Sequence, residues 1–466
     1  MGRHLAFVLM AAGAVTGCAT YTPAPLTSAG VATNYARRSL APEVVRQDLA
    51  HIAPSAQWDG ASWDRLALFA ALSANNPGVV AARSRAISAE YAARAARAGP
   101  AMTLTLTAEY ARSAPDSSPW LYGATSDVPL DIGARRAARV RSSDLAALMA
   151  RYDYAEVLWA ARLGLRRALA ERFIAARQVS IAEELARVRA RQLAAMQRRF
   201  DAGEVARIEL ERVRADTAAD TRRLAESQAR SIAARAALAD ALGVPSSVIE
   251  NVPLAWDGFD APTAPADADI ASARQDALLS RADVLRAVAA YDVAESDLRG
   301  AVARQYPELH LGPGYTWERG LVKLPFSLGL VLPPLDFNRN AIRAAEASRM
   351  EAAANLERSI SLAQNAIDTA LGERGAARAA LTRIRSEELA SARTAARQSD
   401  LEIEQGAIDR VDWAAAQASY LQAQLAELDA LLRVHTADSA LEDALRRPLE
   451  GPEMLIVFEH ATGGAG

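Results

Sequence analysis

The chain has almost no lysine. Lys323 is the only one among 466 residues, and it lies in Leu-Val-Lys-Leu-Pro. A phosphate-binding loop needs Gly-Lys-Ser/Thr, so the sequence does not fit a nucleotide-driven motor. The formal net charge is −3, and the sequence therefore predicts no broad basic surface for nucleic acid.

Residue types that carry catalysis or bind metals are also scarce. The five histidines are scattered along the chain, at His4, His51, His310, His435 and His460. No two of them have the spacing of a zinc site, and the chain has no Cys-His set. Ser and Asp are plentiful but unpatterned. We therefore predict no enzyme, no cofactor and no metal site.

Large side chains are few, since aromatics make up only 6% of the chain while hydrophobic residues, many of them alanine, make up 51%. This balance favours long, closely packed helices over a large globular core. Beyond the N-terminal segment, no apolar run approaches the roughly 20 residues of a membrane-spanning helix. Any membrane-spanning part must consist of strands.

The single cysteine, Cys18, excludes an intramolecular disulfide. Residues 1–17 resemble a signal peptide, and Val15-Thr16-Gly17-Cys18 resembles a bacterial lipobox. This resemblance implies lipidation of Cys18, and Ala19 in place of Asp removes the usual signal for retention in the inner membrane. The alternative is an ordinary signal peptide with a chance cysteine. Residues 18–60, rich in Pro, Ser, Thr and Ala, are expected to form an extended, lipidated tether.

The rest of the chain repeats itself at an offset of about 205 residues. Pro129-Leu130-Asp131 recurs as Pro334-Leu335-Asp336. Each half is expected to contain a helix, two strands, a very long helix, a turn and a return helix. The expected divisions are repeat 1 at 61–243, an irregular linker at 244–270, repeat 2 at 271–447 and a flexible tail at 448–466.

Within the repeats, helices are expected over 63–98 and 271–305, strands within about 101–131 and 306–332, and helical hairpins that turn at Gly203 and Gly406. The long helix from Ala134 to Phe200 has a predicted length of roughly 100 Å, at 1.5 Å per residue. Coiled-coil spacing marks two seams, one at Ile174, Ile181, Leu185 and Val188 and one at Leu421, Leu425, Leu428 and Leu432. Helices of this kind alone would also suit an ordinary helical bundle or a cytoskeletal coiled coil.

The strands distinguish these possibilities. Each has about ten residues and alternates apolar with small or polar side chains, as membrane barrel strands do. Four strands cannot close a barrel, and open edges in lipid leave backbone groups unpaired. We therefore expect the protomer to share a barrel with copies of itself, and three copies would give 12 strands, enough for an open lumen. The alternative is two hairpins that cap a soluble helical domain.

The order of elements, the repeat and the lipobox resemble the outer-membrane factor (TolC-like) family over nearly the whole mature chain. The matching motifs are Asn76-Pro77, Val128-Pro-Leu-Asp-Ile-Gly133, Leu332-Pro-Pro-Leu-Asp-Phe337, and the turn segments 202–210 and 405–413. The resemblance implies a mainly α fold with a small membrane β-barrel, a homotrimer, and a helical coiled-coil tunnel through the periplasm of a Gram-negative bacterium.

The resemblance also implies that the helical turns contact a periplasmic adaptor (membrane fusion) protein. The residues expected at that contact are Gly203, Glu204, Val205, Ala206, Gly406, Ala407, Ile408 and Asp409. The second turn lacks the small hydroxyl residue that often follows the glycine, which places the detail of this contact in doubt. Both glycines also serve simply to make the turns.

An acidic cluster beside the second turn suggests a periplasmic gate, because threefold symmetry would gather inward-facing carboxylates into a ring. The candidate residues are Asp400 and Glu404, with Arg410 as a pairing cation that helps to latch the closed state. The alternative is a solvated helix face.

The function that the resemblance implies is passive export through the outer membrane of substrates delivered by an inner-membrane pump. Leu335-Asp-Phe-Asn-Arg-Asn340 resembles partners of resistance-nodulation-division exporters of cations, so drugs and metal cations are the expected substrates. An exit duct for type I protein secretion is one alternative. A non-channel, periplasm-spanning coiled-coil lipoprotein is the alternative from another class.

Overall fold

The computed structural model describes residues 21–99, 101–112, 119–130, 134–263, 267–318 and 320–457. The chain divides into two compact units, residues 1–39 and 40–466. The described part of the first unit contains one helix, α2 (Ser28–Ala36), whose N-terminus is capped by the Thr27 side chain.

The two halves of the second unit run through the same order of elements, and α6 alone has 67 residues. The elements before and within the first half are α3 (Pro42–Ile52), α4 (Arg65–Asn75), α5 (Pro77–Ala96), β1 (Thr103–Tyr110), β2 (Trp120–Leu130), α6 (Arg135–Asp201) and α7 (Arg207–Leu242). The second half contains α8 (Asp267–Ser280), α9 (Ala282–Ala303), β3 (Glu308–Glu318), β4 (Leu321–Lys323), β5 (Phe326–Val331), α10 (Arg339–Arg383), a π-helical segment (Ile384–Leu389), α11 (Ala390–Glu404) and α12 (Arg410–Leu445). The predicted fold class, mainly α with one small sheet, is confirmed.

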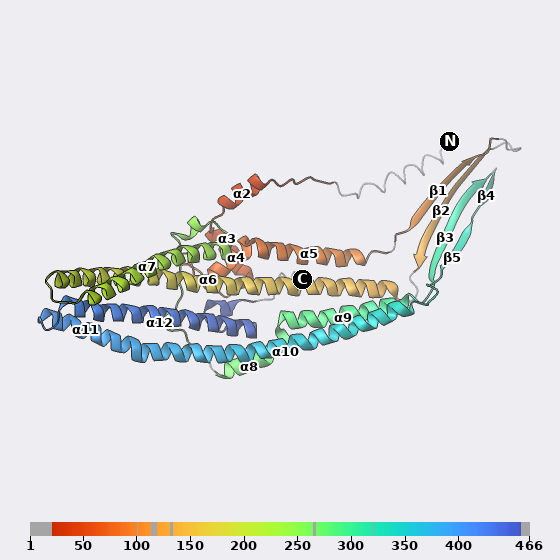
Figure 1. Cartoon of the computed structure of the whole chain (residues 1–466). Helices are drawn as coiled ribbons and strands as arrows, with labels where there is room; N and C mark the ends of the chain where they lie inside the picture. Colours follow the sequence, from red (N-terminus) through yellow and green to blue (C-terminus); the bar gives the residue numbers. More distant parts are fainter. Residues whose placement is uncertain are drawn as a thin grey trace. The chain divides into compact units, whose positions relative to one another are not determined.

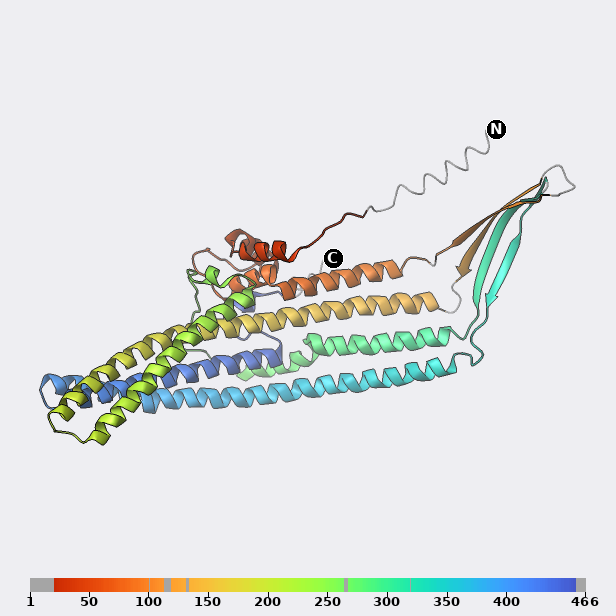
Figure 2. The ribbon, with the colours of Figure 1, turned by 45° about the horizontal axis from the view of Figure 1, so that its top comes forward.

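Helix α6 is the central element of this unit. It packs against α5 and α7 from its own half and against α9 and α12 from the other half, as Figure 1 and Figure 2 show. The two predicted heptad seams meet here, because Leu185 and Val188 of α6 pack on Leu421 of α12. Alanines such as Ala414 and Ala418 fill the remaining space, which lets the helices approach closely.

The first predicted helix of each half is broken where two helices stack end to end. In the first half, the break lies at Asn76, whose side chain donates a hydrogen bond to the carbonyl oxygen of Ala241 at the end of α7 (2.9 Å). In the second half, the break lies at Arg281, which donates to the carbonyl oxygen of Ala444 at the end of α12 (2.5 Å). Helix α5 thus continues the line of the return helix α7, and α9 continues the line of the return helix α12 (Figure 1).

Gly243 closes the first of these junctions. Its φ is +71°, and a Cβ atom built there would lie 2.6 Å from the carbonyl oxygen of Asn75. Both the left-handed backbone and the close approach exclude a side chain. The equivalent position of the second repeat is Arg446, at φ +50°, so only the first junction is tight enough to require glycine.

We expect Gly243→Ala to lower the free energy of unfolding by about 2–4 kcal/mol, the sum of left-handed strain and overpacking. Gly203→Ala is the matched control, because Gly203 has φ +76° but no atom within 4 Å of the place where a Cβ would lie. Denaturant unfolding followed by helical circular dichroism measures both variants. Equal losses would show that the approach to Asn75 contributes nothing.

Three segments differ from the sequence expectations because they pack on the core. The expected extended tether includes α3, whose Val45, Leu49 and Ile52 are buried. The expected linker, although irregular, buries Trp256 and Phe259. The expected flexible tail at 448–466 is packed as far as Val457, whose N–H donates to the carbonyl oxygen of Ile52 (2.8 Å).

The second hairpin contains two short strands where one was predicted. Both β4 and β5 pair with β3 in a single register, from Glu318↔Leu321 to Glu308↔Val331. The interruption coincides with Pro325, which has no N–H to donate, although its carbonyl oxygen still accepts from Gly314 (2.8 Å). The sheet therefore follows four strand paths, as predicted.

Candidate functional site

The antiparallel sheet has two chemically opposite faces. The strand order is β1-β2-β3, with β4 and β5 together on the far side of β3. The pairing register places these residues on one face: Leu104, Leu106, Ala108, Tyr110, Trp120, Tyr122, Ala124, Ser126, Val128, Leu130, Leu309, Leu311, Pro313, Tyr315, Trp317, Val322, Leu324, Phe326, Leu328 and Leu330. We call this set the apolar face; apart from the ring hydroxyls of its tyrosines, Ser126 carries its single hydroxyl group. Such a surface suits hydrocarbon rather than water.

Aromatic rings gather at one end of the apolar face. Tyr110 and Trp120 have ring centroids 4.9 Å apart, Trp120 and Tyr122 5.6 Å, and Tyr122 and Trp317 6.0 Å. The cluster lies at the end of the sheet opposite to the helices, beside the β1–β2 connection (Figure 1). Amphipathic rings in this arrangement are typical of a membrane–water boundary.

The opposite face is mostly polar or small, with Leu121, Leu321 and Val331 as its large apolar residues. It carries Thr103, Thr105, Thr107, Asp127, Glu308, His310, Gly312, Gly314, Thr316, Ser327 and Gly329, among others. His310 contacts Asp127 through Nδ1 (3.0 Å), and Glu308 pairs with Arg135 (2.8 Å) at the helical end of the sheet. We call this set the polar face. Its charges and hydroxyls are suited to line a water-filled passage.

The sheet is open on both sides. Within the described residues, β1 pairs only with β2, and β4 and β5 pair only with β3. Every residue of β1, β4 and β5 is exposed. In lipid, each unpaired backbone group of such an edge would cost several kcal/mol.

At the other end of the long helices, the two predicted turns have the same geometry. Gly203 and Gly406 have φ of +76° and +72°. The next residue of each turn donates to a carbonyl oxygen five positions back, Glu204 to Arg199 and Ala407 to Glu402. This is the pairing of a Schellman motif. All eight residues expected at the adaptor contact lie in or beside these turns with at least part of their surface open to solvent, and Val205, Ile408 and Asp409 are half-buried.

Arg199 joins the two turns. Its side chain pairs with Asp409 (2.5 Å) and with Glu204 (3.5 Å), one residue from each turn. Asp409 also caps α12 by accepting from the N–H groups of Val411 and Asp412. Sequence reasoning missed Arg199. A basic residue in the last turn of a helix is common, and the sequence does not show which residue far along the chain it pairs with.

The candidate gate residues are only partly brought together in one copy of the chain. The carboxylate of Asp400 accepts from Trp413 Nε1 and Gln417 Nε2, both at 2.8 Å. Among the described residues, Glu404 and Arg410 have no ion-pair partner, and both are exposed. A latch through Arg410 would thus need a second copy, and it stays a prediction.

A buried charge cluster lies between α4, α6, α12 and the C-terminal segment. It consists of three arginines and three glutamates, Arg65, Arg162, Arg166, Glu442, Glu450 and Glu453. Arg162 is 0% exposed, and it pairs with Glu442 (2.8 Å) and Glu453 (3.1 Å). Trp256 stacks on the guanidinium groups of Arg65 and Arg166, with centroid distances of 4.6 and 5.2 Å.

Within the cluster, the charged neighbours oppose the effect of burial on the pKa values of Glu453 and Arg166. Burial alone would raise the pKa of Glu453, yet Arg162, Arg65 and Arg166 together hold it below its usual value. Burial likewise opposes the charge on Arg166, but Glu442, Glu453 and Glu450 raise its pKa above the ordinary value. Arg166 and Glu453 therefore stay charged, and each depends on its partners in the cluster. Sequence reasoning missed the cluster, because Glu450 and Glu453 belong to the segment expected to be a loose tail.

His435 lies next to this cluster with its ring stacked on Phe259 (4.4 Å between centroids). Its Nε2 donates to the carbonyl oxygen of Phe259 (2.9 Å), and its buried Nδ1 has no hydrogen-bond partner among the described residues. Burial lowers the pKa of His435 to about 4; the hydrogen bond to Phe259 opposes this shift, and Arg166 reinforces it. The ring is therefore neutral at pH 7.

This shift predicts a loss of stability in acid. Between pH 6.5 and about 4, the unfolded chain binds a proton at His435 that the folded chain does not, so the free energy of unfolding falls as pH falls. The expected loss is up to about 3 kcal/mol. His435→Phe should flatten the pH dependence of the unfolding midpoint between pH 6.5 and 5. Substitution of the exposed His51 by Gln should leave it unchanged, and parallel curves for wild type and His435→Phe would contradict the assignment.

No described helix is both long enough and apolar enough to cross a membrane. In the same stretches of chain, no three His, Cys, Asp or Glu residues are arranged to hold a metal ion. Cys18, the expected lipidation site, lies outside the described residues.

Comparison with known proteins agrees with this geometry. A family model described as outer membrane efflux protein matches residues 68–244 and 273–445, one stretch in each repeat. Comparison with curated sequences gives no significant match. Among solved structures, CusC, described in terms of transmembrane channel formation, superposes with a TM-score of 0.67 at 19% identity, over 84% of this chain and 96% of its own.

Two further solved structures have the same fold. VceC from Vibrio cholerae superposes with a TM-score of 0.65 at 17% identity, covering 82% of this chain and 96% of that chain. The open state of the MtrE outer membrane channel from Neisseria gonorrhoeae gives 0.65 at 18% identity, covering 81% and 88%.

Proposed function

Because the chain belongs to the outer membrane efflux protein family, we propose that three copies form a channel through the outer membrane that continues as a helical tunnel into the periplasm. The channel exports passively what an inner-membrane transporter delivers to it through a periplasmic adaptor protein. Drugs and metal cations are the proposed substrates, and a transporter of the resistance-nodulation-division type is the proposed pump. No catalytic step belongs to this role.

The observation that carries the proposal is the sheet with an apolar face, a polar face and two open edges. If the edge of β1 pairs with the β4–β5 edge of a neighbour, three copies of four strand paths give one closed twelve-stranded wall. The apolar faces then contact lipid, and the polar faces, with Asp127 and His310, surround water.

The paired turns support the adaptor contact. Arg199 pairs with Glu204 of one turn and with Asp409 of the other, so the ends of both hairpins are joined at the far end from the sheet. We propose that the surface they form, from Gly203 to Ala206 and from Gly406 to Asp409, is where the adaptor docks.

We further propose that Cys18 carries lipid and anchors the N-terminus in the outer membrane. Two or more acyl chains would hold the protein firmly, because each buried methylene contributes about 0.8 kcal/mol. Radiolabelled palmitate fed to cells should label the wild-type protein and not the Cys18→Ser variant.

The test of the channel is conductance. The purified protein, added to a planar lipid bilayer, should give discrete single-channel currents, and it should migrate as a trimer on a gel until it is heated. A non-channel coiled-coil lipoprotein would give neither. Loss of export in cells that lack the protein, restored by the wild-type gene, would then connect conductance to efflux.

The proposed gate makes a further prediction. The double substitution Asp400→Asn and Glu404→Gln removes six carboxylates from a trimer, so the channel should be less sensitive to block by divalent cations, with a change in conductance. Glu357→Gln, on the exposed face of α10, is the control. Unaltered single-channel behaviour of the double variant would reject the carboxylate ring.

A further inference from the structure

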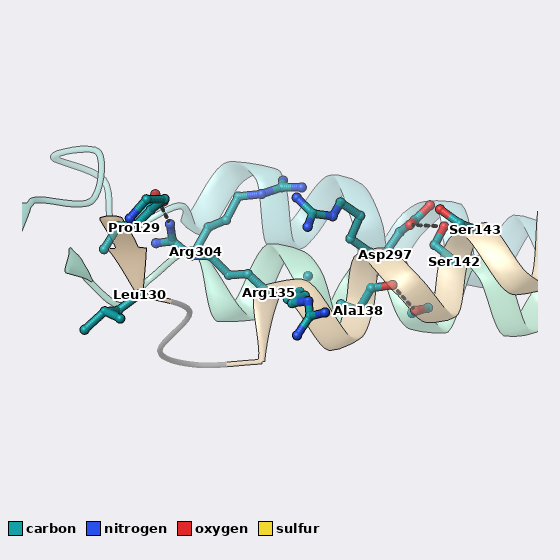
Figure 3. A pocket seen from close by; sticks show the side chains of 13 residues that line it. Pro129, Leu130, Arg135, Ala138, Ser142, Ser143, Asp297 and Arg304 are labelled. Carbon is teal, nitrogen blue, oxygen red and sulfur yellow. Dashed lines mark hydrogen bonds and ion pairs between the residues drawn. The ribbon is translucent and has the colours of Figure 1, made fainter. Parts of the chain in front are cut away.

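A basic pocket lies where the helical end of the sheet meets the first turns of α6 and the last turns of α9 (Figure 3). Pro129 and Leu130, the last residues of β2, form one wall. Ser142, Ser143 and Asp297 line its other end. Four arginines, Arg135, Arg136, Arg139 and Arg304, contribute to the lining.

The carboxylates of the pocket do not neutralise these arginines. Glu308 is engaged by Arg135 at 2.8 Å, and Asp297 accepts a hydrogen bond from Ser142 at 3.0 Å. They are the only two acidic residues that line the pocket within the described part of the chain. Four guanidinium groups thus face two carboxylates, and the pocket keeps an excess of positive charge.

Two of the four arginines remain available for a ligand. Arg135 is committed to Glu308 and to the carbonyl oxygen of Tyr306 (2.5 Å), and Arg136 donates to the carbonyl oxygen of Arg97 (2.6 Å). The side chains of Arg139 and Arg304 are exposed, and they make no hydrogen bond or ion pair to any residue the structure describes. Each presents a planar set of donors that matches the oxygens of a phosphate.

The backbone adds to this charge. Helix α6 begins at a left-handed Ala134 (φ +65°) without a side-chain cap, and its first turn contains no acidic residue. Its first residues are instead Arg135 and Arg136, although cations are unfavourable at the positive end of a helix dipole. A bound anion would offset this unfavourable arrangement.

The pocket also borders the apolar face of the sheet. Leu130 belongs both to the pocket lining and to the apolar face, and across the sheet it pairs with Leu309, which pairs in turn with Leu330. A ligand with its phosphate between the arginines would therefore have a continuous apolar surface for acyl chains directly beside it. A phospholipid carries both parts, a phosphate and acyl chains, in one molecule.

We propose that the pocket binds the phosphate group of an anionic phospholipid, with Arg139 and Arg304 as its principal contacts and the acyl chains on the apolar face. The claim that the phosphate belongs to a lipid rests on the proposed function, which places the sheet in a membrane. The claim that the pocket recognises a phosphate group does not rest on it. Inorganic phosphate has the same chemistry without the chains, and the test separates these two sources.

The full-length protein, purified in detergent and stripped of lipid, is titrated with phosphatidylglycerol, with diacylglycerol, which has no phosphate, and with inorganic phosphate. Bound ligand is counted by native mass spectrometry. We expect Arg139→Gln/Arg304→Gln to weaken phosphatidylglycerol binding about tenfold or more, since two charged contacts are lost. The control Arg393→Gln/Arg397→Gln removes two exposed arginines of α11 and should change it less than about twofold.

Phosphatidylglycerol binding that inorganic phosphate does not displace supports the lipid. Inorganic phosphate that binds alone and depends equally on Arg139 and Arg304 supports the phosphate site with the free anion as its ligand. Equal binding by wild type and the double variant, or equal binding of diacylglycerol and phosphatidylglycerol, overturns the proposal. A protein that binds phosphate but gives no channel currents would contradict the proposed function and leave the site standing.

Discussion

Replacing Leu328 with arginine should prevent the protein from inserting into a membrane. Leu328 lies in the middle of β5 on the apolar face, opposite Leu311 of β3, and it is 58% exposed in one copy. An arginine facing lipid near the middle of a bilayer costs about 2–4 kcal/mol, and a trimer would carry three. The yield of heat-sensitive trimer in outer membranes should fall to a small fraction of the wild-type yield.

The neighbouring residue provides a strict control. Ser327 precedes Leu328 in β5 and lies on the polar face, where its hydroxyl donates to the carbonyl oxygen of Gly312 (3.3 Å). Ser327→Arg adds the same charge one position away and should insert normally, while reducing the conductance for cations. If both variants insert equally well, the assignment of the two faces is wrong.

The second large effect is expected in the buried charge cluster. Glu453 is 2% exposed and pairs with Arg162 and Arg65, both at 3.1 Å. Glu453→Gln keeps the shape of the side chain and removes its charge, which leaves the three arginines of the cluster with only two carboxylates, Glu442 and Glu450. Removing one partner of a buried pair usually costs about 3–5 kcal/mol. The midpoint of denaturant unfolding should fall accordingly.

Glu357→Gln is again the matched control, because Glu357 is exposed on α10 and its charge interacts mainly with solvent. The C-terminal segment should also become accessible in the Glu453→Gln variant, since Glu450 and Glu453 hold it in place. Limited proteolysis should therefore cut the variant within residues 446–457 before the wild type. Wild-type stability combined with wild-type proteolysis would show that the cluster is not a structural anchor.

Local patterns along the chain were sufficient to predict the sheet and the long helices. Alternation in Thr103-Leu104-Thr105-Leu106 depends only on the two-residue period of a strand, which the observed register reproduces. The break at Pro325 is likewise a local matter, because a proline cannot donate to its neighbour. The seams around Leu185 and Leu421 are visible because a helix repeats its faces every few residues.

Contacts between distant segments were not predictable in this way. Arg162 and Glu442 are 280 positions apart, and each has an ordinary helical context. The end-to-end junction at Gly243 depends on where α5 begins relative to α7, which no local pattern records. The pairing of Arg199 with Asp409 depends in the same way on how the two hairpins are packed.

The central claim is that identical copies close the sheet, and cross-linking between its edges tests this most directly. Thr105 of β1 and Ser327 of β5 both lie on the polar face at opposite edges of the sheet, separated within one copy by β2 and β3. We compare the variant Thr105→Cys/Ser327→Cys with Thr103→Cys/Ser327→Cys and Thr107→Cys/Ser327→Cys, which cover neighbouring registers between β1 of one copy and β5 of the next. In cells producing the variant whose register fits, oxidation should yield covalent dimers and trimers and nothing larger. Only monomers in all three variants, or a ladder that continues beyond the trimer, would contradict closure by three copies.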